Sequence, residues 1–129
     1  MFRVLFANPD PKLCDLYEKK LTQQKFLVDS AADGLTALRK FRANPSHVVI
    51  SEYQLPVLSG LALLKSIRSH SKLYSTPFIF LSDHHDNSVA LSLAANEWIE
   101  KQQALPEYLI ERIYYHLKLN KAPIINYGI

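Results

Sequence analysis

The chain has 129 residues, of which 48% are hydrophobic and 21% charged, and its formal net charge is +3. These values fit one globular domain and exclude an intrinsically disordered chain, while so mild a charge does not by itself indicate nucleic-acid binding. The single cysteine, Cys14, excludes a disulfide within the chain, and no apolar run approaches the ~20 residues of a membrane helix. We therefore expect a cytoplasmic protein with neither a membrane-spanning segment nor a signal peptide.

The first strand and helix can be read from the N-terminal residues. Residues 4–7 form a continuous apolar run that predicts a strand. Asn is a favoured N-cap and Pro is favoured in the first helical position, so Asn8-Pro9 predicts the start of a helix. Asp10 then falls in the first helical turn, where an acid is favourable to the helix dipole. Apolar residues at helical spacing continue this helix to Leu21.

The rest of the chain repeats this alternation of strand and helix. Further short apolar runs predict strands at residues 26–28, 47–51, 78–81 and 98–99. Apolar residues at helical spacing predict helices that contain residues 35–41, 61–67, 83–95 and 105–119. Asn44-Pro45 and Thr76-Pro77 interrupt the pattern, because the residue before a proline disfavours the helical region.

The fold class follows from this (βα)5 alternation. Continuous apolar strands separated by amphipathic helices indicate a doubly wound α/β fold, with a five-stranded parallel sheet covered on both faces. In such sheets, binding and catalytic sites form at the carboxyl ends of the strands. The polar residues expected at those ends are 8–10, Glu52, 82–83 and 100–101.

Three patterns at these strand ends resemble response-regulator receiver domains of two-component signalling. Residues 48–52, followed by Leu55-Pro56 and Ser59-Gly60, resemble the phosphoacceptor strand and loop of that family. Residues 77–82 resemble its fourth strand, which ends in a switch Ser or Thr, and residues 94–101 resemble the stretch that ends in its lysine. The resemblance implies a flavodoxin-like fold with strand order 2-1-3-4-5. It also implies a receiver domain at residues 1–120, with residues 121–129 a tail or the start of a linker.

The resemblance also implies which residues occupy the phosphorylation site. Glu52 stands at the position of the phosphoacceptor Asp, and Asn8 and Pro9 stand at the acid pair that holds Mg²⁺ in the family. Ser82 and Lys101 retain the two positions that contact the phosphoryl group. Mg²⁺ requires carboxylates, so with Asp10 one position too late we expect no cofactor and Mg²⁺ binding that is weak or lost.

These departures lead to a prediction about function. The chain is expected to be a pseudo-receiver that recognises proteins without being phosphorylated and that is not an enzyme. Glu52 would pair with Lys101 and accept a hydrogen bond from Ser82, which would mimic the phosphorylated state in part; the alternative is a relic ion pair that only holds the loop. Two other functions stay open: a response regulator still phosphorylated at an atypical acid, and a flavodoxin-like small-molecule binder or hydrolase.

Aromatic residues near the C-terminus suggest where a partner would bind. Trp98 stands where the family often has a rotamer-switching Tyr or Phe, and it is equally consistent with a packed anchor or an interface residue. Tyr108, Tyr114 and Tyr115 on the last helix are further interface candidates, the alternative being ordinary aromatic packing. The expected partner is a sensor kinase, an output protein or a second copy, and neither nucleic acid nor a membrane.

Overall fold

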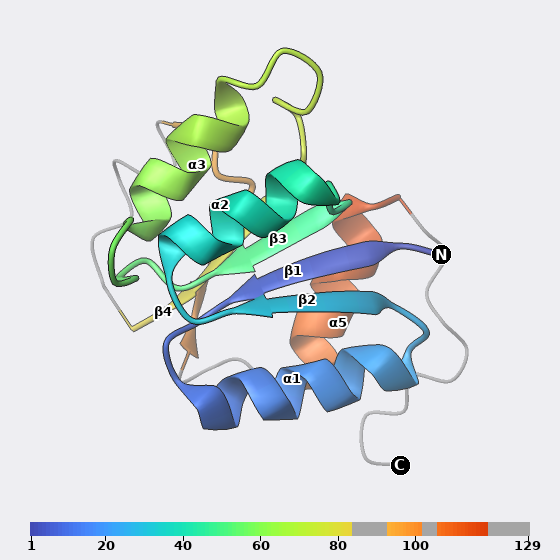
Figure 1. The fold of residues 1–129 in the computed structure, drawn as a ribbon. Helices are drawn as coiled ribbons and strands as arrows, with labels where there is room; N and C mark the ends of the chain where they lie inside the picture. Colours follow the sequence, from blue (N-terminus) through green and yellow to red (C-terminus); the bar gives the residue numbers. More distant parts are fainter. Residues whose placement is uncertain (84–92, 102–105, 119–129) are drawn as a thin grey trace.

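The computed structural model describes residues 1–83, 93–101 and 106–118 and contains one parallel sheet in the order β2-β1-β3-β4-β5 (Figure 1). The strands are β1 (Arg3–Ala7), β2 (Leu27–Ala31), β3 (Val48–Ser51), β4 (Phe78–Ser82) and β5 (Glu97–Glu100). The helices are α1 (Pro11–Gln23), α2 (Gly34–Ala43), α3 (Gly60–Arg68) and α5 (Pro106–His116). The predicted flavodoxin-like, doubly wound fold with strand order 2-1-3-4-5 is confirmed. The helix predicted at residues 83–95 lies mostly outside the described residues, and the tail at residues 121–129 lies entirely outside them.

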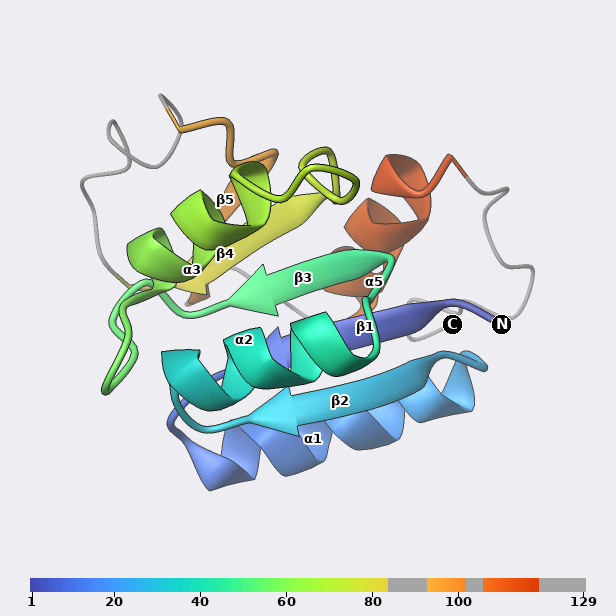
Figure 2. The ribbon, with the colours of Figure 1, turned by 45° about the horizontal axis from the view of Figure 1, so that its top comes forward.

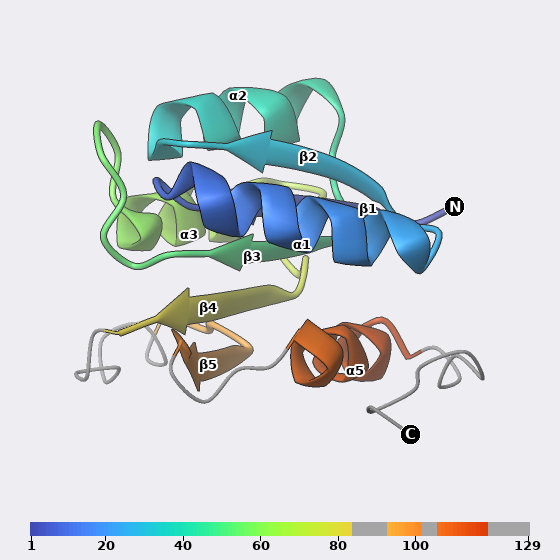
Figure 3. The same cartoon turned by 90° about the horizontal axis from the view of Figure 1, so that it is seen from below.

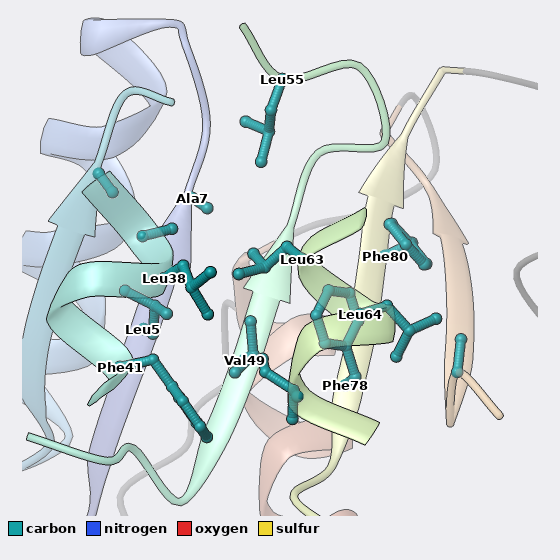
Figure 4. Close-up of a cluster of buried hydrophobic side chains, with 14 residues drawn as sticks. Leu5, Ala7, Leu38, Phe41, Val49, Leu55, Leu63, Leu64, Phe78 and Phe80 are labelled. Atoms are coloured by element: carbon teal, nitrogen blue, oxygen red, sulfur yellow. The ribbon is translucent and has the colours of Figure 1, made fainter. Parts of the chain in front are cut away.

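The described helices cover both faces of the sheet (Figures 1, 2 and 3). On one face α2 and α3 bury Leu5, Val49 and Phe80 in a single hydrophobic cluster (Figure 4). On the other face α1 and α5 bury the alternate residues of the same strands, including Phe6 and Ile50. Successive side chains of a strand point to opposite faces, so a strand covered on both faces must be apolar at every position. This explains why the central strands read as unbroken apolar runs.

The start of α1 differs from the prediction. The N-cap is Asp10, whose side chain accepts a hydrogen bond from Lys12 N, and Pro11 opens the helix in place of Pro9. Asn8 remains beside the sheet because its backbone N–H donates to Ala31 O at 2.9 Å. Its Oδ1 accepts from Asp10 N at 2.8 Å. This bond forms a turn over residues 8–10, so the helix begins two residues later than predicted. Asp10 is therefore the cap of α1 and not a residue of its first turn.

The β2 strand is longer than predicted. The apolar run suggested residues 26–28, whereas the strand extends from Leu27 to Ala31 through Asp29 and Ser30. It lies at the edge of the sheet with a single neighbouring strand, and residues 27–30 are exposed or half-buried, so polar side chains are tolerated there. Arg3 on β1 forms an ion pair with Asp29 at 3.1 Å and stabilises this polar stretch.

Candidate functional site

Glu52 is a buried acid at the carboxyl end of β3. Its backbone N–H donates to Ala7 O at 2.9 Å, so the residue still follows the sheet, and only 7% of it is exposed. The side chain turns back over the loop that follows, where Oε1 accepts from Tyr53 N at 3.0 Å. Gly60 opens α3 against the same segment: a Cβ there would lie 2.3 Å from Glu52 O. The position of the carboxylate is therefore set by the central strand β3, by the N–H of Tyr53 and by the close approach of Gly60 to the backbone of Glu52.

Ser82 and Lys101 both contact this carboxylate. The hydroxyl of Ser82, fully buried at the end of β4, donates to Glu52 Oε1. Lys101, directly after β5, places Nζ 2.8 Å from Glu52 Oε2. Parallel strands end at one edge of the sheet, which is why three residues so distant in sequence meet here. The structure therefore brings Glu52, Ser82 and Lys101 together, with both carboxylate oxygens already engaged.

The chain after the end of the neighbouring strand β1 adds no further carboxylate to this site. Three residues follow that strand end: Asn8, Pro9 and Asp10. Asn8 is 1% exposed, and its Oδ1 accepts from Asp10 N, while its Nδ2 has no hydrogen-bond partner among the described residues. Pro9 is exposed and has no polar side-chain atom. Asp10 is also exposed, and its carboxylate caps α1. Asn8 and Pro9, which replace the acid pair, and Asp10 after them thus turn the chain from β1 into α1.

This donor set does not fit a Mg²⁺ ion. Mg²⁺ is held octahedrally by hard oxygen ligands, usually one or two carboxylates with waters and phosphate. Glu52 directs its two oxygens at an ammonium and a hydroxyl, and the carboxylate of Asp10, after the end of β1, serves as a helix cap. Among residues 1–83, 93–101 and 106–118, no three His, Cys, Asp or Glu side chains are grouped closely enough to hold a metal.

The loop after Glu52 is held in a strained turn that sequence reasoning missed. Val57 has φ 69°, a left-handed conformation that a β-branched residue rarely adopts, and Leu58 N donates back to Pro56 O at 2.7 Å. Pro56 O also accepts from Gly34 N at 3.1 Å. A Cβ on Gly34 would lie 1.8 Å from Leu58 O, so this position requires glycine. The loop is thereby fixed against the start of α2.

Trp98 packs within this site. Its ring lies 5.4 Å from that of Tyr53 and 5.1 Å from that of Phe80, both centroid to centroid, and it borders the cluster under α2 and α3. These contacts favour the packed anchor among the three interpretations of Trp98. They also show that Tyr53, which the sequence did not single out, joins the Glu52 loop to β5.

The three tyrosines of α5 have different environments. Tyr108 and Tyr115 are 43% and 61% exposed, whereas Tyr114 packs its ring 5.5 Å from Phe26. Burial raises the pKa of Tyr114, as expected for a phenol against an apolar ring. Two of the predicted interface residues are thus available on the surface, and Tyr114 belongs to the packing between α5 and the start of β2.

A polar cluster between β5 and α5 also escaped the sequence analysis. Arg112 Nε donates to both oxygens of Glu97 at 2.9 Å, and His116 Nε2 lies 2.6 Å from Glu97 Oε1. The Arg112 guanidinium also covers the ring of Tyr115 at 4.3 Å. Arg112 and His116 are four residues apart on one helix face, which is the only signal the sequence carried. The cluster fixes α5 on the edge strand and orders Tyr115.

Comparison with known proteins defines the class. The structure superimposes on the chemotaxis response regulator CheY4 of Vibrio cholerae with TM-score 0.83 and 25% identity, covering 90% of this chain and 98% of that one. It superimposes on the receiver domain of Francisella response regulator 1452 with TM-score 0.80 and 27% identity, covering 92% and 98%. A parallel sheet of this order, with an acid, a hydroxyl and a lysine at its third, fourth and fifth strand ends, is that of a CheY-like signalling domain.

The chain belongs to the response regulator receiver domain family, whose model matches residues 4–114. It is therefore a receiver domain of two-component signalling. Among curated proteins it is 29% identical over 112 residues to the response regulator ArlR of Staphylococcus aureus, covering 84% of this chain and 50% of that protein. The chain thus spans about half the length of this relative. No helix in the described part of the chain is long and apolar enough to cross a membrane.

Proposed function

We propose that this receiver domain acts without being phosphorylated, by binding another protein through a surface whose conformation Glu52 helps to set. One observation carries the proposal: the phosphoacceptor position holds a buried carboxylate whose two oxygens already bind Ser82 and Lys101. In phosphorylated receivers these two positions would contact the phosphoryl oxygens. Here a permanent side chain occupies that role, and Asn8 and Pro9 leave the metal position without carboxylates.

The expected strength of this effect is moderate. A phosphoryl group brings about −1.5 to −2 charges and three acceptor oxygens, whereas Glu52 offers one charge and two oxygens. Moving a two-state equilibrium from 1:99 to 99:1 takes about 5.5 kcal/mol. The ion pair with Lys101, whose side chain is 27% exposed, contributes about 1 kcal/mol after solvent screening. Glu52 therefore biases the conformation of the loops but does not lock it.

The proposed activity is recognition and not catalysis. The reaction of an active receiver needs a strand-end Asp and a Mg²⁺ that neutralises the incoming phosphate, and neither requirement fits Glu52, Asn8 and Pro9. Glutamate is one methylene longer than aspartate, and its oxygens point at Lys101 and Ser82. The partner would be a sensor kinase, an output protein or a second copy of the domain, with Tyr108 and Tyr115 as exposed contact residues.

The test compares the natural chain with a variant that restores the missing groups. The protein is treated with acetyl phosphate and Mg²⁺ and followed by intact mass, and with beryllofluoride and Mg²⁺ by amide resonances of Ser82 and Lys101. We expect no gain of a phosphoryl group and no shift in the natural chain. The triple variant Asn8→Asp, Pro9→Asp and Glu52→Asp is expected to gain at least Mg²⁺-dependent shifts. Phosphorylation of the natural chain would overturn the proposal and favour an atypical phosphoacceptor.

A further inference from the structure

The charges of the described residues are distributed unequally between the two faces of the sheet. Residues 34–82 contain six lysines and arginines but a single acid, Glu52, which is buried and paired with Lys101. This segment includes α2 and α3, which lie together on one face (Figures 1 and 2). The other eleven acidic residues lie outside the segment. The small net charge of the chain thus conceals one distinctly basic face.

A groove on this face runs between the C-terminal halves of α2 and α3. The C-terminal ends of α2 and α3 lie at the opposite end of the sheet from the carboxyl end of β3 (Figure 1), which Glu52 directly follows. The floor of the groove is apolar and its rim is basic, with contributions from both helices: the floor residues are Leu38, Phe41 and Ile67, and the rim residues are Arg42, Lys65 and His70. The groove is therefore separate from every residue assigned to the receiver site, and a ligand could occupy it whatever the state of Glu52.

Two of the basic residues at the groove are available to a ligand. Arg42 and Lys65 are exposed, and neither side chain makes a hydrogen bond or an ion pair with the described part of the chain. Arg68 is different, because its guanidinium donates to Ala94 O, Thr76 O and Asn96 Oδ1 and holds the chain that leads to β4 and β5. Arg68 is thus structural, while Arg42 and Lys65 project from adjacent helices without a partner among the described residues.

Cations in the last turn of a helix have a simpler explanation, since they interact favourably with the helix dipole. That effect accounts for Arg42 on α2 and Lys65 on α3 separately. It does not account for their position on opposite sides of one apolar groove, nor for the lack of any exposed acid on either helix. A groove with an apolar floor and cations on two sides matches an acidic peptide that also carries an apolar side chain.

We propose that the groove between α2 and α3 binds an acidic, leucine-containing segment of a partner protein. Carboxylates of the segment pair with Arg42 and Lys65, and a leucine side chain contacts the floor at Leu38 and Ile67. Nucleic acid fits less well, because its affinity comes from many phosphate contacts and this groove offers two unpaired cations and an apolar floor. The proposal goes beyond the function assigned to Glu52 and does not depend on it.

The experiment titrates the isotope-labelled chain with a capped peptide of about ten residues in which Asp and Glu alternate with Leu. We expect saturable shifts at the amides of the C-terminal half of α2 and of residues 65–70, which weaken as salt is raised from low concentration to about 0.15 M. The variant Arg42→Gln/Lys65→Gln should bind about five- to tenfold more weakly. The control Lys12→Gln/Lys19→Gln, which removes the same charge from exposed positions of α1, should change the affinity by less than about twofold.

Other results would overturn the proposal. A peptide with Gln and Asn in place of the acids is tested on the natural chain, so this comparison does not depend on the folding of any variant. Equal binding of the neutral peptide, or equal loss in both double variants, would exclude a carboxylate-specific groove. A duplex oligonucleotide that binds the same amides more tightly than the acidic peptide would replace the proposal with nucleic-acid binding. The absence of saturable shifts at α2 and α3 would refute it outright.

Discussion

Lys101 Nζ lies 2.8 Å from Glu52 Oε2, and this ion pair joins the loop after β5 to the loop after β3 across the end of β4. The side chain of Glu52 is 9% exposed and that of Lys101 is 27% exposed. The pair is thus shielded from solvent more than a surface ion pair is, but it is not fully desolvated, since the ammonium remains in contact with water. Its energy can be measured by removing each partner in turn; without Lys101 the buried Glu52 carboxylate keeps the hydrogen bonds from Ser82 and Tyr53 N.

A double-mutant cycle on this pair is expected to give a favourable coupling energy of about 1 kcal/mol. Glu52→Gln removes the charge but keeps an acceptor for Ser82 and Tyr53 N, and Lys101→Met removes the ammonium but keeps the aliphatic stem. Urea unfolding of the natural chain, both single variants and the double variant supplies the four free energies. Additive single effects would show that the pair contributes nothing to stability.

Gly34→Ala is expected to destabilise the chain by about 2–3 kcal/mol, although alanine is the better helix former. The added Cβ would lie 1.8 Å from Leu58 O, which is backbone, so the loop that carries Pro56 must move. The exposed residue at the other end of α2 provides a control: Ala43→Gly should cost about 1 kcal/mol or less, from helix propensity alone. Chemical denaturation measures both, and a neutral or stabilising Gly34→Ala would contradict the close approach.

Val57→Gly is expected to stabilise the chain by about 0.5–1 kcal/mol. A left-handed conformation costs an L-residue about 1–2 kcal/mol, and this gain is reduced by the larger backbone entropy that glycine loses on folding. Val57 is 79% exposed, so little buried surface is lost with its side chain. Val57→Ala, which keeps a Cβ, should recover less of this energy. Thermal and urea unfolding distinguish the two, and equal effects would show that φ at this residue is not the cause.

The thiol of Cys14 is expected to react slowly with iodoacetamide at neutral pH. Burial raises its pKa, and the nearby carboxylates of Asp15, Asp10 and Glu18 raise it further, so the reactive thiolate forms only at higher pH than in free cysteine. The rate of alkylation followed by mass spectrometry should therefore rise with a midpoint above that of N-acetylcysteine. Asp15→Asn should lower the midpoint, while Asp29→Asn on β2 should leave it unchanged. A midpoint equal to that of N-acetylcysteine would disprove the shift.

The fold was predictable because its signal is local and repeated. Each central strand is covered on both faces and reads as an unbroken apolar run, and each helix carries its own apolar stripe. The start of α1 was not predictable in this way. Asn8-Pro9 and Asp10-Pro11 satisfy the same rule for a cap followed by proline, and the choice is made by the bond from Asn8 N to Ala31 O on another strand. A contact between distant segments outweighed a local preference.

In the candidate site, too, some contacts could be predicted from the sequence and others depend on how distant segments pack. Glu52, Ser82 and Lys101 could be placed together from the sequence because the ends of parallel strands meet at one edge. The cluster of Glu97 with Arg112 and His116 could not, since it depends on how α5 crosses the edge strand. The strained turn at Val57 was missed because valine carries none of the usual signals for a left-handed residue.

Trp98 is the only tryptophan in the chain, and its ring contacts Tyr53, which directly follows Glu52, and Phe80, which lies two residues before Ser82. The natural protein therefore carries its own optical probe at the receiver site. A partner, an anion or a substitution that moves the Glu52 loop must change the surroundings of this indole. Its emission maximum and its quenching by acrylamide will report that movement in an unlabelled chain, in real time and at concentrations at which weak self-association is absent.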